Sequence, residues 1–162
     1  MTLILSWITR AFCVAACDGK AIIKHADGRI ESAAEDVTKI HPVAPDIAIV
    51  CGGDTALAET LVKAATVGFV APFGHEGPWQ PSTQPEYFCG LELMVPSLCK
   101  IFCMSHTYEV PQDNGVILLG YDPRQKMMRG VGFDSNVDFE PVEIPLRTLV
   151  THGWEDGKML AA

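Results

Sequence analysis

Three residues of types that often bind metal recur at helical spacing in the second half of the chain. Cys99, Cys103 and His106 stand at positions i, i+4 and i+7, so a helix would carry them on one face. Thiolates and imidazole are ligands that zinc prefers, but a structural zinc site takes four ligands and no fourth is evident. The same spacing is typical of a buried stripe. We therefore expect these residues to pack in the core, with no metal and no cofactor bound.

Two other groups have side chains that could take part in chemistry. Cys17 beside Asp18 offers a thiol nucleophile, but no histidine lies near it in the sequence to act as its base. His75 and Glu76 lie in a Gly- and Pro-rich segment over 68–85, which we expect to be a loop. They lack the second histidine of a zinc-protease helix. The loop could cover a pocket or form a subunit contact, because loops often carry functional residues.

Length and charge limit the classes of protein to consider. The 162 residues, 48% hydrophobic and 20% charged, fit one globular domain over 1–162. Twelve Lys and Arg against twenty Asp and Glu give a net charge of −8, without any basic run. Nucleic-acid binding rests largely on clustered basic residues, so nucleic acid is not an expected partner. No uncharged apolar stretch approaches the roughly 20 residues that span a bilayer, so no membrane partner is expected either.

The six cysteines indicate the cellular compartment, because disulfides form mainly in oxidising compartments. Most of them lie in apolar segments, which is typical of reduced core thiols rather than disulfides. Residues 14–17, Val-Ala-Ala-Cys, resemble the cleavage box of bacterial lipoproteins. However, Arg10 splits the apolar run, and residues 1–8 lack the basic side chain of an export signal. We expect a cytoplasmic protein.

The apolar pattern predicts an α+β fold with the order strands, helix, helix, strands, in which helices pack outside antiparallel sheets. Residues 42–46, rich in Pro, are expected to form a turn, and 139–162 an edge strand followed by a polar tail. The second helix contains Pro96, which should kink or interrupt it. The predicted helices are 56–67 and 85–107, and the predicted strands are 2–8, 11–17, 20–25, 29–33, 47–51, 115–122 and 126–134.

Three features in a fixed order resemble a known family. A strand begins at Thr2, an Asp-Gly turn at Asp18 ends the second strand, and Lys39 precedes an apolar strand that ends in Gly52-Gly53. This order resembles the proteasome-like branch of the N-terminal nucleophile (Ntn) hydrolases, which includes proteasome β subunits and the peptidase HslV. The segment GVILLGYDPRQKMMRGVGFDSN is similar to the family's hairpin. The resemblance covers 2–136 and implies a four-layer αββα sandwich, in which the family's usual C-terminal helices could be lacking.

The resemblance assigns a role to each of these residues. Thr2 would be the nucleophile and, through its freed α-amine, the general base, as in the Thr-N-terminus variant of the nucleophile–base pair. Lys39 would lower the pKa of that amine from its ordinary value of about 7.7–8.0. Asp18 would pair with Lys39, and the Gly52 N–H would donate to the oxyanion.

The sequence also departs from the family pattern. Lys39 matches only with an insertion of about five residues near the turn at 26–28, so Lys20 and Lys24 are rival candidates for the lysine. Met1 precedes Thr2, and the amine becomes free only when Met1 is removed. The family's Gly-Ser-Gly-type turn has no counterpart in 149–162, and Asp134-Ser135 is a poor substitute for its Asp/Ser pair. The resemblance covers the nucleophile half of the site better than the supporting half.

The functional expectation is a threonine peptidase or amidohydrolase that cleaves a peptide or small amide substrate through an acyl-enzyme. The alternative is a non-catalytic proteasome-like protein that serves assembly or partner binding. By resemblance, either would form a homo-oligomer, and an ATPase is a possible partner. Whether the chain is an enzyme stays open at this point.

Overall fold

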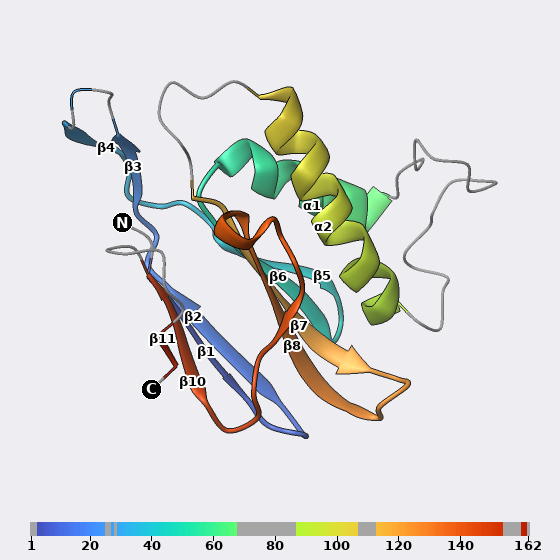
Figure 1. Cartoon of the computed structure of the whole chain (residues 1–162). Coiled ribbons are helices and arrows are strands. Elements are labelled where there is room, and N and C mark those ends of the chain that lie inside the picture. Colours follow the sequence, from blue (N-terminus) through green and yellow to red (C-terminus); the bar gives the residue numbers. More distant parts are fainter. Residues whose placement is uncertain are drawn as a thin grey trace.

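Two antiparallel sheets lie face to face, and both helices pack on the outer face of one of them (Figure 1). The computed structural model describes residues 3–24, 27, 29–67, 87–106, 113–153 and 160–161. These residues form one helical layer and two sheet layers, which confirms the α+β class and the antiparallel sheets.

The helix-covered sheet has the strand order β5-β6-β7-β8-β9. Its inner strands are buried on both faces and therefore read as nearly continuous apolar runs. The hairpin of β7 and β8 forms as predicted, with Gly115 opposite Asp134 and Asp122 opposite Met127. The strands are β5 (Ile40–Ala44), β6 (Ile47–Gly52), β7 (Gly115–Asp122), β8 (Met127–Asp134) and β9 (Val142–Glu143).

Helices α1 (Thr55–Val67) and α2 (Tyr87–Ser105) cover this sheet with apolar side chains at helical spacing. The Asp54 carboxylate accepts the Ala56 N–H at 2.8 Å and so caps the start of α1. Pro96 lies inside α2 but does not interrupt it. By length and composition α2 could cross a bilayer, yet seven of its side chains are buried, and they include Phe88, Leu91 and Val95 in the main core.

The second sheet has the order β11-β10-β1-β2, formed by β1 (Leu3–Ile8), β2 (Cys13–Cys17), β10 (Leu149–Gly153) and β11 (Leu160–Ala161). Ile4 and Ile8 of β1 point inward and join Val50 and Ile117 in a second apolar cluster between the sheets. Alternate positions point away from it, so Trp7, Val14 and Leu149 are exposed on the outer face.

A separate hairpin of β3 (Ala21–Lys24) and β4 (Ile30–Ala34) stands apart from both sheets (Figure 1). It corresponds to the predicted strands on either side of Asp27. A short 3₁₀ helix (Ser135–Val137) follows β8, and the Asp134 carboxylate caps it by accepting the Asn136 N–H.

Two predicted segments were wrong. The predicted turn at 42–46 is in fact the strand β5, which continues to Ala44 through a bulge and leaves the turn to Pro45 and Asp46. Pro42 is tolerated because β5 is an edge strand, where a missing N–H breaks no inner ladder. The predicted polar tail contains β10, which pairs with β1 from Leu3 to Trp7. Backbone pairing with β1 determines this strand, and its own side-chain pattern is too short to indicate it.

Candidate functional site

The ends of four strands meet at one edge of the two sheets. Ile4 pairs with Cys17, so the start of β1 lies beside the end of β2, where Asp18 follows. Lys39 directly precedes β5, and its carbonyl accepts the Cys51 N–H of β6 at 2.9 Å. The end of β6 therefore lies beside Lys39. This edge, from Asp18 to Gly52, is the candidate site.

The Lys39 ammonium is buried at the centre of this edge. Its Nζ lies 2.5 Å from Asp18 Oδ1 and donates to the Lys20 carbonyl at 2.7 Å. The Lys39 side chain is only 6% exposed, whereas Asp18 is 35% exposed. Burying an unpaired ammonium costs several kcal/mol. The Asp18 carboxylate and the Lys20 carbonyl offset this cost, because they replace the water that the ammonium loses. A fixed cation of this kind favours the neutral form of a nearby amine.

The strand-to-helix turn after β6 has a backbone conformation that depends on glycine. Gly53 has φ of +102°, which side-chain-bearing residues rarely adopt. A Cβ at Gly53 would lie 2.3 Å from Asn114 Oδ1 and 2.7 Å from the Asp113 carbonyl. Gly53 is thus required where the turn packs closely on the chain that leads into β7.

Asn114 holds this turn in place. Its Oδ1 accepts the Asp54 N–H at 2.8 Å, and its Nδ2 lies 3.8 Å from Cys103 Sγ on α2. Its backbone N–H donates to Ser135 Oγ at 3.0 Å, and the Ser135 N–H donates back to the Asn114 carbonyl. The side chain is almost fully buried. One residue therefore links the turn beside Gly52 to α2 and to the end of β8.

The buried thiols around this turn are not activated. Burial raises the pKa of Cys51 to about 12, and it also raises the pKa of Cys99, with further contributions from Cys51 and Cys103. A protonated thiol is a poor nucleophile, so the raised pKa values argue against Cys51 and Cys99 as nucleophiles at neutral pH. Cys99 lies in the core as predicted, but His106 is exposed and stacks on Phe102 at 3.8 Å between ring centroids. In the described part of the chain, no group of three His, Cys, Asp or Glu is arranged to hold a metal ion.

The structure brings only part of the predicted set together. Asp18 and Lys39 are in contact, and Gly52 is buried at the end of the strand beside them. Lys20 is exposed and contributes its carbonyl to Lys39. Thr2 lies outside the described residues, as do the 68–85 loop and its two candidates His75 and Glu76. Of Lys24, the structure describes the backbone in β3 only.

Sequence reasoning missed Asn114. It lies in an Asp-Asn-Gly run just before a strand, which indicates a turn and nothing more. Only the three-dimensional structure shows that its amide reaches a residue 60 positions earlier in the chain.

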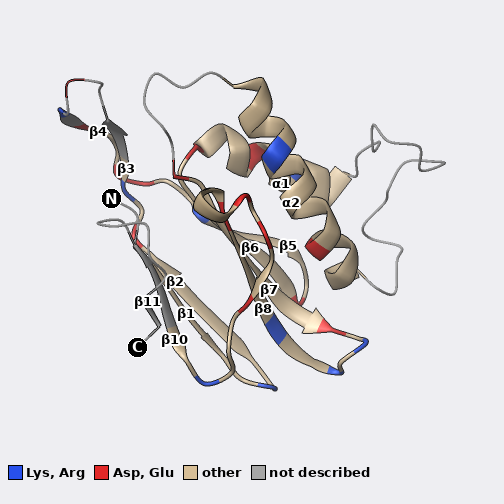
Figure 2. Ribbon diagram, in the orientation of Figure 1, with Lys and Arg blue, Asp and Glu red and all other residues tan. Residues whose placement is uncertain are grey.

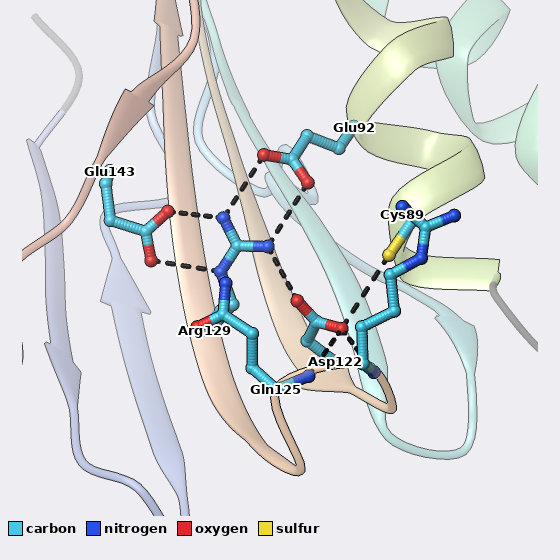
Figure 3. A network of polar contacts seen from close by, with 7 residues as sticks. Cys89, Glu92, Asp122, Gln125, Arg129 and Glu143 are labelled. Carbon is cyan, nitrogen blue, oxygen red and sulfur yellow. Dashed lines mark hydrogen bonds and ion pairs between the residues drawn. The ribbon is translucent and has the colours of Figure 1, made fainter.

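A second buried polar cluster lies at the opposite end of the β7–β8 hairpin (Figure 3). The Arg129 guanidinium donates to Asp122 at 2.7 Å, to Glu143 at 2.5 Å and to Glu92 at 3.2 Å. Asp122 is 1% exposed. Burial tends to raise its pKa, but hydrogen bonds from Arg129 and from the N–H groups of Arg124 and Gln125 outweigh this and lower it. The cluster ties α2 to β7, β8 and β9, which is a structural role.

No protein-family model matches the chain, and a search of curated proteins finds no significant match. Function is therefore inferred from the residues and geometry of the site.

Proposed function

We propose that this chain is a threonine-type hydrolase that cleaves amide bonds through an acyl-enzyme. The observation that carries the proposal is the buried Lys39–Asp18 pair at the edge where β1 begins. Leu3, the first residue of β1, is one peptide bond from Thr2. A desolvated cation beside the start of a chain is what an N-terminal threonine needs to keep its amine neutral.

The proposed reaction has two halves. Once Met1 is removed, the α-amine of Thr2 takes the proton from its own hydroxyl, and Oγ attacks the substrate carbonyl. By resemblance, the oxyanion is assigned to the Gly52 N–H, and that donor must first leave its place opposite Gly115 in the β6–β7 ladder. The tetrahedral intermediate collapses to an ester on Thr2, and the ammonium returns its proton to the leaving amine. Water, deprotonated by the same amine, then hydrolyses the ester and frees Thr2.

Two features of the site support Lys39 over its rivals. The Lys20 side chain is exposed, and its carbonyl serves as an acceptor for Lys39. Lys39 is buried and paired with Asp18, and its backbone carbonyl accepts the N–H of Cys51, the residue before Gly52. Burial and the ion pair with Asp18 therefore favour Lys39 over Lys20 as the cation of the proposal.

The proposal includes the four-layer αββα arrangement of the resembled family. A further layer would cover the outer face of the β1 sheet, where Trp7, Val14 and Leu149 are exposed. It also includes a homo-oligomer, a peptide or small amide substrate, a cytoplasmic location and, by resemblance alone, an ATPase partner.

One observation favours the alternative, a non-catalytic protein that keeps this fold for assembly. The Ser135 hydroxyl accepts the Asn114 N–H, and the Asp134 carboxylate caps the following 3₁₀ turn. Both side chains are therefore engaged in structural hydrogen bonds. Neither is a ready support for a nucleophile at the start of β1.

Turnover decides between the two functions. The protein is prepared with Thr2 as its first residue and assayed against a panel of fluorogenic peptide amides, beside Thr2→Ala and Lys39→Met variants. The hydrolase predicts release by the parent and loss of about 100-fold or more in both variants. Release that survives Thr2→Ala would exclude the mechanism. No release by a folded parent would favour the assembly role.

A further inference from the structure

A groove runs along the outer side of α2, away from the candidate site. It has a volume of about 360 Å³ and lies between α2 and the connection that follows β8. Leu93, Pro96 and Pro141 give it an apolar lining. The remaining lining residues are Glu92, Ser97, Lys100, Phe139 and Glu140.

An apolar ridge on α2 begins at this groove. Leu93 is 75% exposed, Ile101 41% and Met104 87%. They stand at i, i+8 and i+11 on the helix, so they share one side of it over about 16 Å. Large apolar side chains exposed on one side of a helix, with Ser97 and Lys100 between them and a groove beside them, favour an interaction surface.

Acidic residues recur along the chain between β8 and β10 (Figure 2), and Glu140 of this segment lines the groove together with Glu92 of α2. Lys100 pairs with Asp138 at 2.8 Å and with Glu140 at 3.6 Å. Arg129 pairs with Glu92, Asp122 and Glu143. Of the charged residues that line the groove, Glu92 and Glu140 outnumber Lys100, which leaves an excess of one negative charge in the lining. Such an excess attracts a cationic ligand.

Pro96 adds a backbone hydrogen-bond acceptor to the acidic lining of the groove. Proline has no N–H, so the Glu92 carbonyl loses the i→i−4 hydrogen bond of a regular helix. Both Glu92 and Pro96 line the groove. A carbonyl and carboxylates on one lining suit the N–H donors of a lysine or arginine side chain.

We propose that this groove and ridge dock a cationic amphipathic helix of a partner protein. Its apolar residues would lie against Leu93, Ile101 and Met104, and its Lys or Arg side chains would face Glu92 and Glu140. This is the helix-in-groove mode of recognition. The inference is independent of the proposed hydrolase activity, because none of its residues belongs to the candidate site.

Charge argues against the other occupants of such a surface. An anionic bilayer attracts basic helices, and the acidic surroundings of this groove would be repelled from it. A second copy of this chain would bring another acidic groove against the first, and like charges in contact disfavour that pairing. A cationic partner is the occupant that this surface attracts.

Fluorescence anisotropy with a labelled amphipathic peptide tests the proposal. The probe is a peptide of Leu and Lys of about 18 residues, long enough to form a helix, with Leu at helical spacing. The comparison probes are a peptide of the same composition with the Leu residues scattered, and one with Glu in place of Lys. We expect saturable binding of the first probe, and binding at least about tenfold weaker for the other two.

Matched variants locate the binding on the protein. Leu93→Gln should weaken binding of the Leu/Lys probe by about tenfold, while Phe12→Gln, at an exposed apolar residue of the β1–β2 turn, should leave it unchanged. Glu140→Gln should weaken it and reduce its salt dependence, while Glu59→Gln on the exposed side of α1 should not. Circular dichroism of each variant confirms that it is folded.

Several results would overturn the proposal. Equal binding of the Glu probe, or binding of the Leu/Lys probe that Leu93→Gln leaves unchanged, would show that the groove does not select a cationic helix. Self-association in sedimentation velocity that Leu93→Gln abolishes would assign the surface to a second copy. Tighter binding to vesicles of anionic lipid than to the probe, lost in Leu93→Gln, would assign it to a membrane.

Discussion

Lys39 and Asp18 are the two residues on which the functional argument depends most. The Lys39 ammonium is almost completely buried, so it is stabilised by its contacts with protein groups and not by water. The same pair that supports a catalytic role is also expected to contribute to stability, and the two contributions can be measured separately.

Asp18→Asn should lower the free energy of unfolding by about 1–3 kcal/mol, because it removes a charge-assisted hydrogen bond from a buried ammonium. Urea unfolding followed by circular dichroism measures this loss. Asp27→Asn is the matched control, since Asp27 also pairs with a cation, Arg29 at 2.6 Å, but both partners are exposed. Equal losses of unfolding free energy in the two variants would show that the burial of Lys39 does not strengthen its pair with Asp18.

Arg129 should be the most costly polar residue to replace in the buried cluster. Arg129→Met leaves the buried Asp122 carboxylate unpaired and should cost about 3–5 kcal/mol in unfolding free energy. The exposed Arg10, changed to Met, serves as the control and should cost little. If Arg129→Met lowers the unfolding free energy by less than about 1 kcal/mol, the Arg129 cluster does not stabilise the packing of α2 on the sheet.

Asp122 should make stability depend on pH in the acid range. Its pKa is lowered in the folded state, so the stability it contributes is fully present above its ordinary value of about 3.9 and is lost as pH falls through the lower folded value. Asp122→Asn should therefore be less stable than the parent at pH 7, and the difference should shrink below about pH 4. Urea unfolding between pH 7 and pH 3 measures this, and a difference that does not change with pH would contradict it.

Among the elements, the strand-to-helix turn between β6 and α1 is the most constrained. Gly53→Ala should destabilise the protein by about 2 kcal/mol or more, because the new Cβ meets the Asn114 amide in a backbone conformation of positive φ. In an Asn114→Ala background the added cost should fall, although the Asp113 carbonyl still stands close. Thermal unfolding of the four proteins of this cycle gives the coupling, and additive effects would contradict the contact.

The sequence correctly predicted the elements whose own residues include a turn motif or a regular apolar spacing. The strands around Asp27 are separated by an Asp-Gly turn, and Leu57 and Leu61 recur at helical spacing in α1. β10 has no such signal, since its place depends on pairing with β1, about 145 residues away. The Asp18–Lys39 contact followed from the resemblance, whereas the Asn114 link is a long-range hydrogen bond that no local pattern indicates.

At the scale of the whole molecule, the described residues place two polar centres at opposite ends of the β7–β8 hairpin. One end holds the candidate site and its Asn114 link, and the other holds the Arg129 cluster (Figures 1 and 3). Apolar clusters on both faces of the helix-covered sheet separate them. The proposed chemistry and the proposed docking groove therefore belong to different parts of the molecule and can be tested independently.

The most direct test of the proposed function is the intact mass of freshly purified protein before and after incubation with a β-lactone, an electrophile that acylates an N-terminal threonine. The proposal predicts a parent mass that lacks Met1 and a single adduct that maps to Thr2, with acylation slowed by about 100-fold in Lys39→Met. A folded protein that retains Met1 and takes no adduct, or an adduct that forms equally fast in Lys39→Met, would contradict it.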